Sequence, residues 1–238
     1  IRQGVGRRIE RCPPRRKFIE RDSTRERVTR GRHRARCTRN PSPHPMIQIA
    51  GVDEAGRGPL AGPVVAAAVL WSDDYRVEGL TDSKKLSHRQ RESLRIELES
   101  LLPARHWAVG SASPAEIDEV NILQATYLAM HRAIAQLQPA PTLLLVDGNR
   151  FKPFDGIVHR CEIKGDARFQ AISAASIFAK TERDRLMTAL HQEFPHYGWD
   201  RNMGYPSPGH RAAIEAHGPS PWHRRSFAWK PRQLQIDL

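Results

Sequence analysis

From residue 46 onward, short apolar runs alternate with longer stretches in which apolar and polar positions recur with a helical period. An apolar run of about four to eight residues between turn signals predicts a buried strand, and apolar positions at every third or fourth residue predict a helix. The short runs predict five strands, at Ile47–Val52, Val64–Trp71, His106–Ser111, Thr142–Asp147 and Val158–Ile163.

The longer periodic stretches predict four helices, at Ser87–Leu102, from Ser113 to about Leu137, at Phe169–Glu193 and at His210–His217. Two of these helix starts carry capping signals. Ser87 has Gln90 three residues on, and Ser113 is followed by Pro and has Glu116 three residues on. Both patterns have the spacing of a capping box, and Pro favours the first position of a helix.

The alternation of strands and helices predicts an α/β domain, a mixed sheet flanked by helices, over residues 46–193. Residues 194–238 are rich in Pro, His and Arg and contain one of the expected helices. We therefore expect a small helical C-terminal region that packs on the α/β domain.

Residues 1–45 show no hydrophobic periodicity and carry fifteen basic residues against four acidic ones, an excess of +11 out of the chain's +12. Such a segment buries too little apolar surface to offset the entropy of ordering, so we expect it to be disordered. It reads as a basic arm for phosphates, as a transit peptide, or as an upstream extension from a misplaced start. The first Met is Met46, and we favour the misplaced start.

The remaining bulk properties exclude some classes of protein. No apolar run approaches the length of about 18 residues that indicates a membrane span. Cys12, Cys37 and Cys161 are scattered and odd in number, which fits neither a disulfide framework nor a zinc site. We expect a cytoplasmic protein that does not associate with membranes and is a monomer.

Four carboxylates stand at positions where chemistry is expected. Asp53 and Glu54 end the first strand, Asp147 ends the apolar run Thr142–Asp147, and Asp166 precedes the longest helix. Ligand sites of open α/β sheets gather at strand ends, so these side chains can converge. Clustered carboxylates repel one another, and oxygen ligands favour a hard divalent cation such as Mg²⁺ or Mn²⁺. Two such ions about 4 Å apart support phosphodiester hydrolysis.

Each acid also has a plain structural interpretation. Acids are common in the solvated loops after strands, and Asp147-Gly148 is an ordinary turn signal. Neighbouring residues of a strand point to opposite faces, so Asp53 and Glu54 share a site only if the strand ends there. Gly56 and Gly58 favour that ending.

A series of short segments carries more specific patterns than the acids alone. In chain order they are Gly51–Pro63 (GVDEAGRGPLAGP), Asp82–Leu86 (DSKKL), Val146–Asn149 (VDGN), Lys164–Asp166 (KGD), Ala174–Ile177 (AASI), Gly204–Pro206 (GYP) and His223–Phe227 (HRRSF). Taken together over residues 47–228, they resemble the motifs of the type 2 ribonucleases H, the ribonuclease HII family.

The resemblance implies a ribonuclease H-like fold and an endonuclease. Its substrates would be RNA–DNA hybrids and duplex DNA containing ribonucleotides, which it would nick 5′ of the ribonucleotide, leaving 3′-hydroxyl and 5′-phosphate ends. The metal-binding catalytic residues implied by the resemblance are Asp53, Glu54, Asp147 and Asp166. The implied cofactors are Mg²⁺ or Mn²⁺, two ions per site.

The resemblance also assigns substrate contacts. The loop Gly56-Arg57-Gly58 would read the ribose 2′-hydroxyl, which separates RNA from DNA, and residues without Cβ let the backbone approach a sugar closely. Tyr205 would stack on the adjoining deoxyribose, and Ser83 and Lys84 would hold a backbone phosphate. The plain alternatives are a simple turn, a packed tyrosine and a solvated face.

Some departures and open assignments remain in the motifs. Met203 stands where the family often has Lys, and Ser207 stands where it often has Thr. Arg224 and Arg225 fit a nucleic-acid contact and a structural role equally well. None of these positions is among the proposed metal ligands.

The sequence also allows two other functional hypotheses. The first keeps the fold and changes the specificity, to a type 3 ribonuclease H or a nuclease of plain DNA. Type 3 enzymes carry a folded N-terminal platform, which the Arg-rich residues 1–45 do not suggest. The second is a non-enzymatic nucleic-acid-binding module whose affinity comes from the Arg-rich arm.

The charge distribution predicts how a shortened chain that begins at Met46 behaves. Residues 46–238 carry a net charge of only +1, so removing residues 1–45 should leave turnover unchanged and reduce only the salt-sensitive part of substrate affinity. The measurement compares turnover and salt-dependent binding of the full and shortened chains. Loss of all turnover in the shortened chain would favour the binding module.

Overall fold

The computed structural model of this chain describes residues 48–80, 83 and 86–228. These residues belong to one compact unit. The expected disordered segment 1–45 and the proposed phosphate contact Lys84 lie outside the described residues, as do residues 229–238. The division expected between residues 193 and 194 stays a prediction.

A five-stranded mixed sheet forms the centre of the fold, with strand order β3-β2-β1-β4-β5. The middle strand β1 pairs antiparallel with β2 and parallel with β4, β3 pairs antiparallel with β2, and β5 pairs parallel with β4. The bounds are β1 Ile49–Ala55, β2 Val64–Trp71, β3 Trp107–Ala112, β4 Leu143–Asp147 and β5 Val158–Glu162. The predicted mixed α/β sheet is therefore confirmed.

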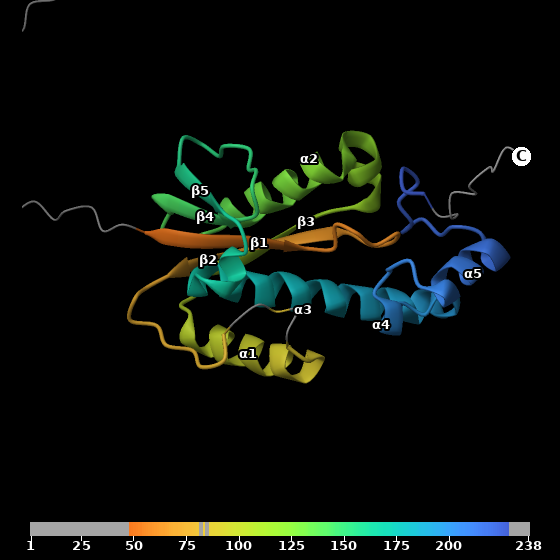
Figure 1. Ribbon diagram of the computed structural model, residues 1–238, viewed down its shortest axis with the longest axis horizontal. Coiled ribbons are helices and arrows are strands. Elements are labelled where there is room, and N and C mark those ends of the chain that lie inside the picture. The colour runs from red at the N-terminus through yellow and green to blue at the C-terminus, as the bar shows by residue number, and fades with distance from the viewer. Residues whose placement is uncertain (1–47, 81–82, 84–85, 229–238) are drawn as a thin grey trace, which may run out of the picture. The chain divides into compact units, whose positions relative to one another are not determined.

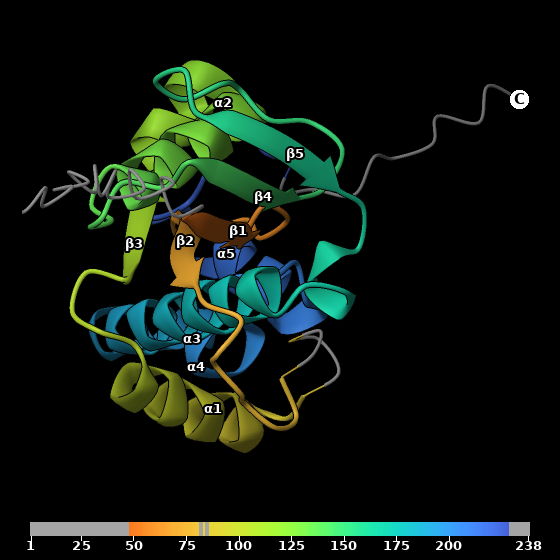
Figure 2. The ribbon, with the colours of Figure 1, turned by 90° about the vertical axis from the view of Figure 1, so that its left-hand side faces the viewer.

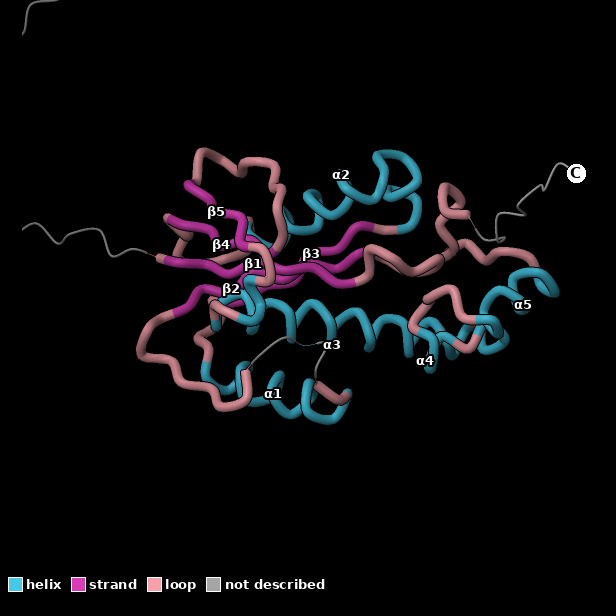
Figure 3. Tube along the Cα trace, in the orientation of Figure 1, coloured by secondary structure: helices cyan, strands magenta, loops and turns pink. Residues whose placement is uncertain are grey.

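Helices cover both faces of the sheet, α2 on one face and α3, with α1 outside it, on the other (Figures 1 and 2). The short helices α4 and α5 follow at the far end of α3, where loops make up much of the chain (Figure 3). The bounds are α1 His88–Leu101, α2 Pro114–Ile134, α3 Gln170–Glu193, α4 Trp199–Asn202 and α5 Pro208–His217, with 3₁₀ turns at Gly165–Ala167 and Pro195–Tyr197.

Both predicted capping boxes are present. The Ser87 hydroxyl accepts from the Gln90 N–H and the Gln90 side chain accepts from the Ser87 N–H, and Ser113 and Glu116 form the same reciprocal pair. Such a box satisfies two of the backbone donors that a helix start leaves unpaired. These local signals set the starts of α1 and α2.

The prediction of one uninterrupted helix from Ser113 to about Leu137 is wrong in detail. Asn121 has φ 69° and ψ 163°, which breaks α2, and its Oδ1 accepts from the N–H groups of Leu123 and Gln124 as the cap of the second part. An Asn side chain can replace backbone hydrogen bonds in this way. The break turns Val120, expected on the apolar face, out to 37% exposure.

The two faces of the sheet bury separate apolar cores. Ala50 and Val52 of β1 face the core under α2, whereas Ala67 and Val69 of β2 face the core under α3 and α1. Gly51 lies against α3, and a Cβ there would come within 2.1 Å of the Ala171 carbonyl carbon. The glycine therefore sets the close approach of β1 to the start of α3.

A third cluster ties the C-terminal region to the rest of the unit. Trp199 and Tyr197 pack with Met187 of α3 and with Leu60 and Ala61 from the segment after β1. Asp118 of α2 accepts from the N–H groups of Arg225 and Ser226, each at 2.8 Å. The C-terminal segment thus contacts both the β1 loop and α2.

The outer edge of β3 is covered by side chains. Gln136 Nε2 donates to the Val109 carbonyl at 3.0 Å, and Arg132 Nη1 donates to the Ser111 carbonyl at 2.7 Å. Carbonyls on an edge strand otherwise remain open to pairing with another chain. At the opposite edge, β5 ends at Glu162, and Ile163, expected within the strand, is 67% exposed.

The contact between Gly51 and α3 gives a stability prediction. Gly51→Ala should lower the free energy of unfolding by roughly 1–3 kcal/mol or more, because the new methyl meets backbone atoms that cannot rotate away. Chemical denaturation measures the change. Gly209→Ala in α5 is the matched control, since a Cβ there meets nothing within 4 Å, and it should be neutral or stabilise by about 0.5 kcal/mol. Equal effects of the two substitutions would contradict the prediction.

Candidate active site

The proposed site lies at the end of β1, where β1 is no longer paired with β4 but is still paired with β2. Pairing with β4 ends at Val52 and Val146, whereas pairing with β2 continues through Ala55. The expectation that the strand ends at Asp53 and Glu54 is therefore wrong on the β2 edge, where β2 is long enough to pair with β1 to its end. Asp53 and Asp147 are the next residues on two parallel strands, just past their last pair.

Because β1 stays extended, its two acids point to opposite faces of the sheet. Asp53 lies on the α3 side, where its carboxylate bonds to the Ser176 hydroxyl, and Glu54 continues the Ala50 and Val52 side that faces α2. Asp53 Oδ1 also accepts from the Glu54 N–H at 2.7 Å. The acids meet around the end of the sheet rather than on one face.

Three of the four predicted acids are close enough to affect one another. Burial raises the pKa of Asp53 well above its usual value, and the charges of Glu54 and Asp147 raise it further. The Glu54 N–H and the Ser176 hydroxyl lower the pKa of Asp53, but by less. The fold thus holds a buried carboxylate beside two others, which is unfavourable without a compensating cation.

Asp166 reaches the same end of the sheet through the 3₁₀ turn Gly165–Ala167. The Gly165 N–H donates to Asp147 Oδ1 at 2.8 Å, and the Ser173 hydroxyl donates to the Asp166 carbonyl at 2.5 Å. Asp166 is buried. Asp166 is therefore next in sequence to Gly165, which contacts Asp147 directly. The bond from Ser173 fastens the turn to the start of α3.

The donor chemistry of this end of the sheet fits a hard divalent cation. The groups are carboxylate oxygens, and the pKa of Asp53 is raised first by burial and then by the charges of Glu54 and Asp147, both of which a bound cation would offset. Within the described residues, no three His, Cys, Asp or Glu side chains already form a set able to hold a metal ion.

A cleft of about 220 Å³ opens beside the acids on the α3 side of the sheet. Of the described residues that were predicted as metal ligands or substrate contacts, all except Asp147 and Asp166 line this cleft. Its lining consists of Asp53, Glu54, Ala55, Gly56, Arg57, Gly58, Ser83, Ser176, Lys180, Arg183 and Tyr205. We call it the glycine-loop cleft.

A second cleft, of about 280 Å³, lies on the α2 side and shares Glu54 and Arg57 with the first. It also contains Asp147. Its other lining residues are Leu123, Thr126, Tyr127, Met130, Gly148, Asn149 and Arg150. The Arg57 guanidinium lies 3.2 Å from Glu54 Oε1, so this ion pair stands at the border of the two clefts.

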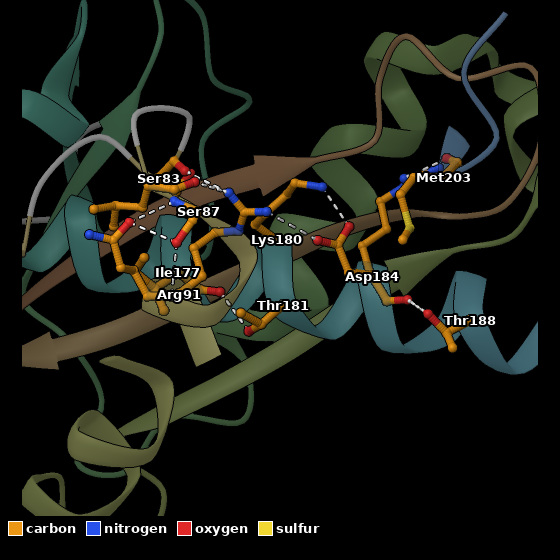
Figure 4. Close-up of polar contacts among 12 residues, drawn as sticks. Ser83, Ser87, Arg91, Ile177, Lys180, Thr181, Asp184, Thr188 and Met203 are labelled. Atoms are coloured by element: carbon orange, nitrogen blue, oxygen red, sulfur yellow. Dashed lines mark hydrogen bonds and ion pairs between the residues drawn. The ribbon is translucent and has the colours of Figure 1, made fainter. Parts of the chain in front are cut away.

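Helix α3 contributes side chains to the glycine-loop cleft that were not predicted as site residues. Ser176 Oγ lies 2.6 Å from Ser83 Oγ. Lys180 Nζ donates to Asp184 Oδ1 at 2.5 Å (Figure 4). Arg91 of α1 lies 3.7 Å from Asp184 Oδ2 and donates to the Ser83 carbonyl at 3.1 Å. The network holds Ser83 at the cleft.

A signal for these residues was present in the sequence. Ser176, Lys180 and Arg183 are spaced by four and three residues along the longest helix, which places them on one face. Their position beside Asp53 depends on the packing of α3 against β1, which the spacing alone does not give.

Tyr205 is 45% exposed at the mouth of the glycine-loop cleft and is held by its backbone. His210 Nδ1 donates to the Tyr205 carbonyl at 2.9 Å, and His210 Nε2 accepts from Trp199 Nε1 at 3.0 Å. Ser207, the residue in place of Thr, caps α5 by accepting from the His210 N–H. The hydroxyl that a Thr would supply at this cap is retained.

Comparison with known proteins identifies the group to which this arrangement belongs. A family model described as Ribonuclease HII matches residues 50–230. The chain belongs to the ribonuclease HII family. It is thus a ribonuclease H, an endonuclease and hydrolase of a family that cleaves the RNA of RNA–DNA hybrids.

Individual relatives agree with the family assignment. A ribonuclease HII of Porphyromonas gingivalis is 56% identical over 181 residues, which cover 76% of this chain and 89% of the relative. The ribonuclease H2 structure from Pyrococcus horikoshii OT3 has a TM-score of 0.64 and 31% identity, covering 77% of this chain and 95% of that one. A PCNA:RNase HII complex from Archaeoglobus fulgidus has a TM-score of 0.64 and 30% identity, covering 80% and 99%.

The raised pKa of Asp53 predicts the sign of a stability change in this ribonuclease HII. Between the ordinary pKa of 3.8 and the higher folded-state pKa, the folded state holds more protons, so its stability falls as pH rises. Asp53→Asn removes the ionisable group and with it this pH-dependent loss of stability. The variant should therefore have a higher free energy of unfolding than the unsubstituted chain at neutral pH in chelator. Added Mg²⁺ or Mn²⁺ should then stabilise the unsubstituted chain more than the variant.

Asp184→Asn is the matched control for Asp53→Asn, because Asp184 is equally buried but faces Lys180 and Arg91. Breaking a buried ion pair costs about 3–5 kcal/mol, so this variant should be less stable. Urea denaturation in chelator measures both variants. A loss of stability in Asp53→Asn under these conditions would contradict the prediction.

Proposed function

We propose that this chain nicks duplex DNA on the 5′ side of embedded ribonucleotides and also degrades the RNA of RNA–DNA hybrids, leaving 3′-hydroxyl and 5′-phosphate ends. The observation that carries the proposal is that Asp53 and Glu54 line one cleft with the loop Gly56–Gly58, while the charges of Glu54 and Asp147 both act on Asp53. The acids provide the metal chemistry, and the loop provides a means of reading the sugar.

The residues that would hold Mg²⁺ or Mn²⁺, two ions per site, are Asp53, Glu54, Asp147 and Asp166. When bound, two such ions supply an activated water and stabilise the leaving oxygen of the phosphodiester. The protein's own part is to keep the four acids on the converging ends of β1 and β4 and on the adjacent 3₁₀ turn, with Asp53 buried enough to favour a cation.

Substrate contacts are proposed for the other predicted residues. The N–H groups of Gly56, Arg57 and Gly58 have no acceptor among the described residues and are suited to bonding a ribose 2′-hydroxyl. A Cβ at Gly58 would lie 3.7 Å from the Tyr205 ring and would narrow the space between loop and ring. Tyr205 would stack on the next deoxyribose, and Ser83, with Lys84, would hold a phosphate.

The proposal extends to the cellular role and location of this activity. Its cellular role would be the removal of ribonucleotides from DNA during replication and repair, in the cytoplasm, as a monomer without a membrane partner. Within the described residues, no helix combines the length and apolar character that crossing a bilayer requires.

The proposal is tested with a labelled duplex that contains one ribonucleotide. With Mg²⁺ or Mn²⁺ we expect a cut on the 5′ side of that residue, and with chelator we expect none. A matched all-DNA duplex is the specificity control, because cutting of it would favour a plain DNA nuclease. Absence of any metal-dependent cut at the ribonucleotide would defeat the proposal.

Asp147→Asn tests the metal site within this activity. The substitution removes one charge and one ligand oxygen, so cutting should fall by at least about 10²-fold while binding of the duplex persists. Single-turnover cleavage and filter binding measure the two quantities. Asp155→Asn, an exposed Asp outside both clefts, is the control and should keep full activity. Full activity in Asp147→Asn would remove Asp147 from the site.

A further inference from the structure

Two buried arginines, Arg183 and Arg224, donate hydrogen bonds to backbone carbonyls in and around the loop Gly56–Gly58, which we call the glycine loop. Arg224 donates to the carbonyls of Gly56, Arg57 and Gly62, at 2.5, 3.0 and 3.0 Å. Arg183 of α3 donates to the carbonyls of Ala61, Pro63 and Met203, at 3.1, 3.2 and 3.0 Å. Arg224 is 0% and Arg183 1% exposed, so six carbonyls are held from inside the protein.

The bonds from Arg224 fix the direction of two N–H groups. In a planar trans peptide the C=O and the following N–H point in opposite directions. The Gly56 carbonyl shares its peptide with the Arg57 N–H, and the Arg57 carbonyl shares its peptide with the Gly58 N–H. Because Arg224 draws both carbonyls inward, both N–H groups point away from it, and within the described residues neither has an acceptor.

Arg183 also contacts the loop directly. A Cβ at Gly56 would come within 2.0 Å of Arg183 Nε, so the loop backbone lies directly on this guanidinium. The Arg183 guanidinium also lies 5.9 Å from the centre of the Tyr205 ring. One side chain therefore contacts both the loop and the ring that face each other across the cleft.

Only an arginine can make this set of bonds. Its planar guanidinium carries five N–H donors in a fixed fork, whereas the ammonium of lysine is a compact group on a flexible stem. Burial lowers the pKa of Arg183 to about 10 and that of Arg224 to about 9, so both remain charged at neutral pH. The carbonyl bonds are thus charge-assisted.

We propose that Arg224, supported by Arg183, is a positioning residue for sugar discrimination, which fixes the glycine loop with its N–H groups directed at a ribose 2′-hydroxyl. This inference rests on the proposed function. It assigns selectivity for the ribonucleotide to a residue that does not touch the substrate. It predicts that a lysine at this position keeps the charge but loses the orientation of the loop.

The experiment measures the affinity of the full chain, in chelator, for two duplexes that differ only in one ribonucleotide. Arg224→Lys should reduce the preference for the ribonucleotide-containing duplex by roughly tenfold, the effect of about one lost hydrogen bond, and leave the affinity for all-DNA duplex unchanged. Arg225→Lys is the matched control, because Arg225 is the next residue but exposed, and its preference should not change. Thermal unfolding of each variant is recorded in parallel.

The outcomes separate positioning from stability alone. If Arg224→Lys lowers only the unfolding temperature and keeps the preference, the inference is overturned. Arg183→Lys is measured beside it and should lose preference in the same direction, so an unchanged preference in Arg183→Lys overturns the inference if Arg224→Lys does not fold. A wild-type chain that cuts at the ribonucleotide but binds both duplexes equally also overturns it. A wild-type chain that cuts neither duplex contradicts the proposed function instead.

Discussion

The unequal pairing of β1 with its two neighbours is the constraint on which the site depends. Antiparallel pairing with β2 keeps β1 extended through Ala55, while parallel pairing with β4 stops at Val52. Asp53 and Glu54 therefore lie past the last pair of β1 with β4 but still within its pairing with β2. The same strand stays anchored to α3 through Gly51, which brings Ser176 up to Asp53. The position of β1 therefore determines both the packing of the core against α3 and the geometry of the acids.

Electrostatics in this site works against the folded state and in favour of a ligand. Asp53 of β1 is buried next to two other acids. Asp184 of α3 is buried next to two bases, Lys180 and Arg91. Two carboxylates with similar burial therefore have opposite effects on stability. Asp53 lowers the stability of the fold, whereas Asp184 fastens α1 to α3.

Signals that act within a few residues made much of this fold predictable from the sequence. Ser87 and Ser113 determine their helix starts through bonds to residues three positions away. The break at Asn121 was missed because a positive φ in an Asn leaves no mark in the hydrophobic pattern. The predicted end of β1 at Asp53 and Glu54 was wrong, because the end of this strand depends on the length of β2. The inward direction of Arg224 depends on contacts more than 160 residues away, which no local pattern contains.

The covered edge of β3 has a consequence for how molecules of this protein meet one another. With the carbonyls of Val109 and Ser111 already bonded by Gln136 and Arg132, a strand from a neighbouring molecule finds few acceptors along that border. The opposite border of the sheet is β5, whose partner β4 ends in Asp147. A strand added to β5 would therefore lie next to the acids.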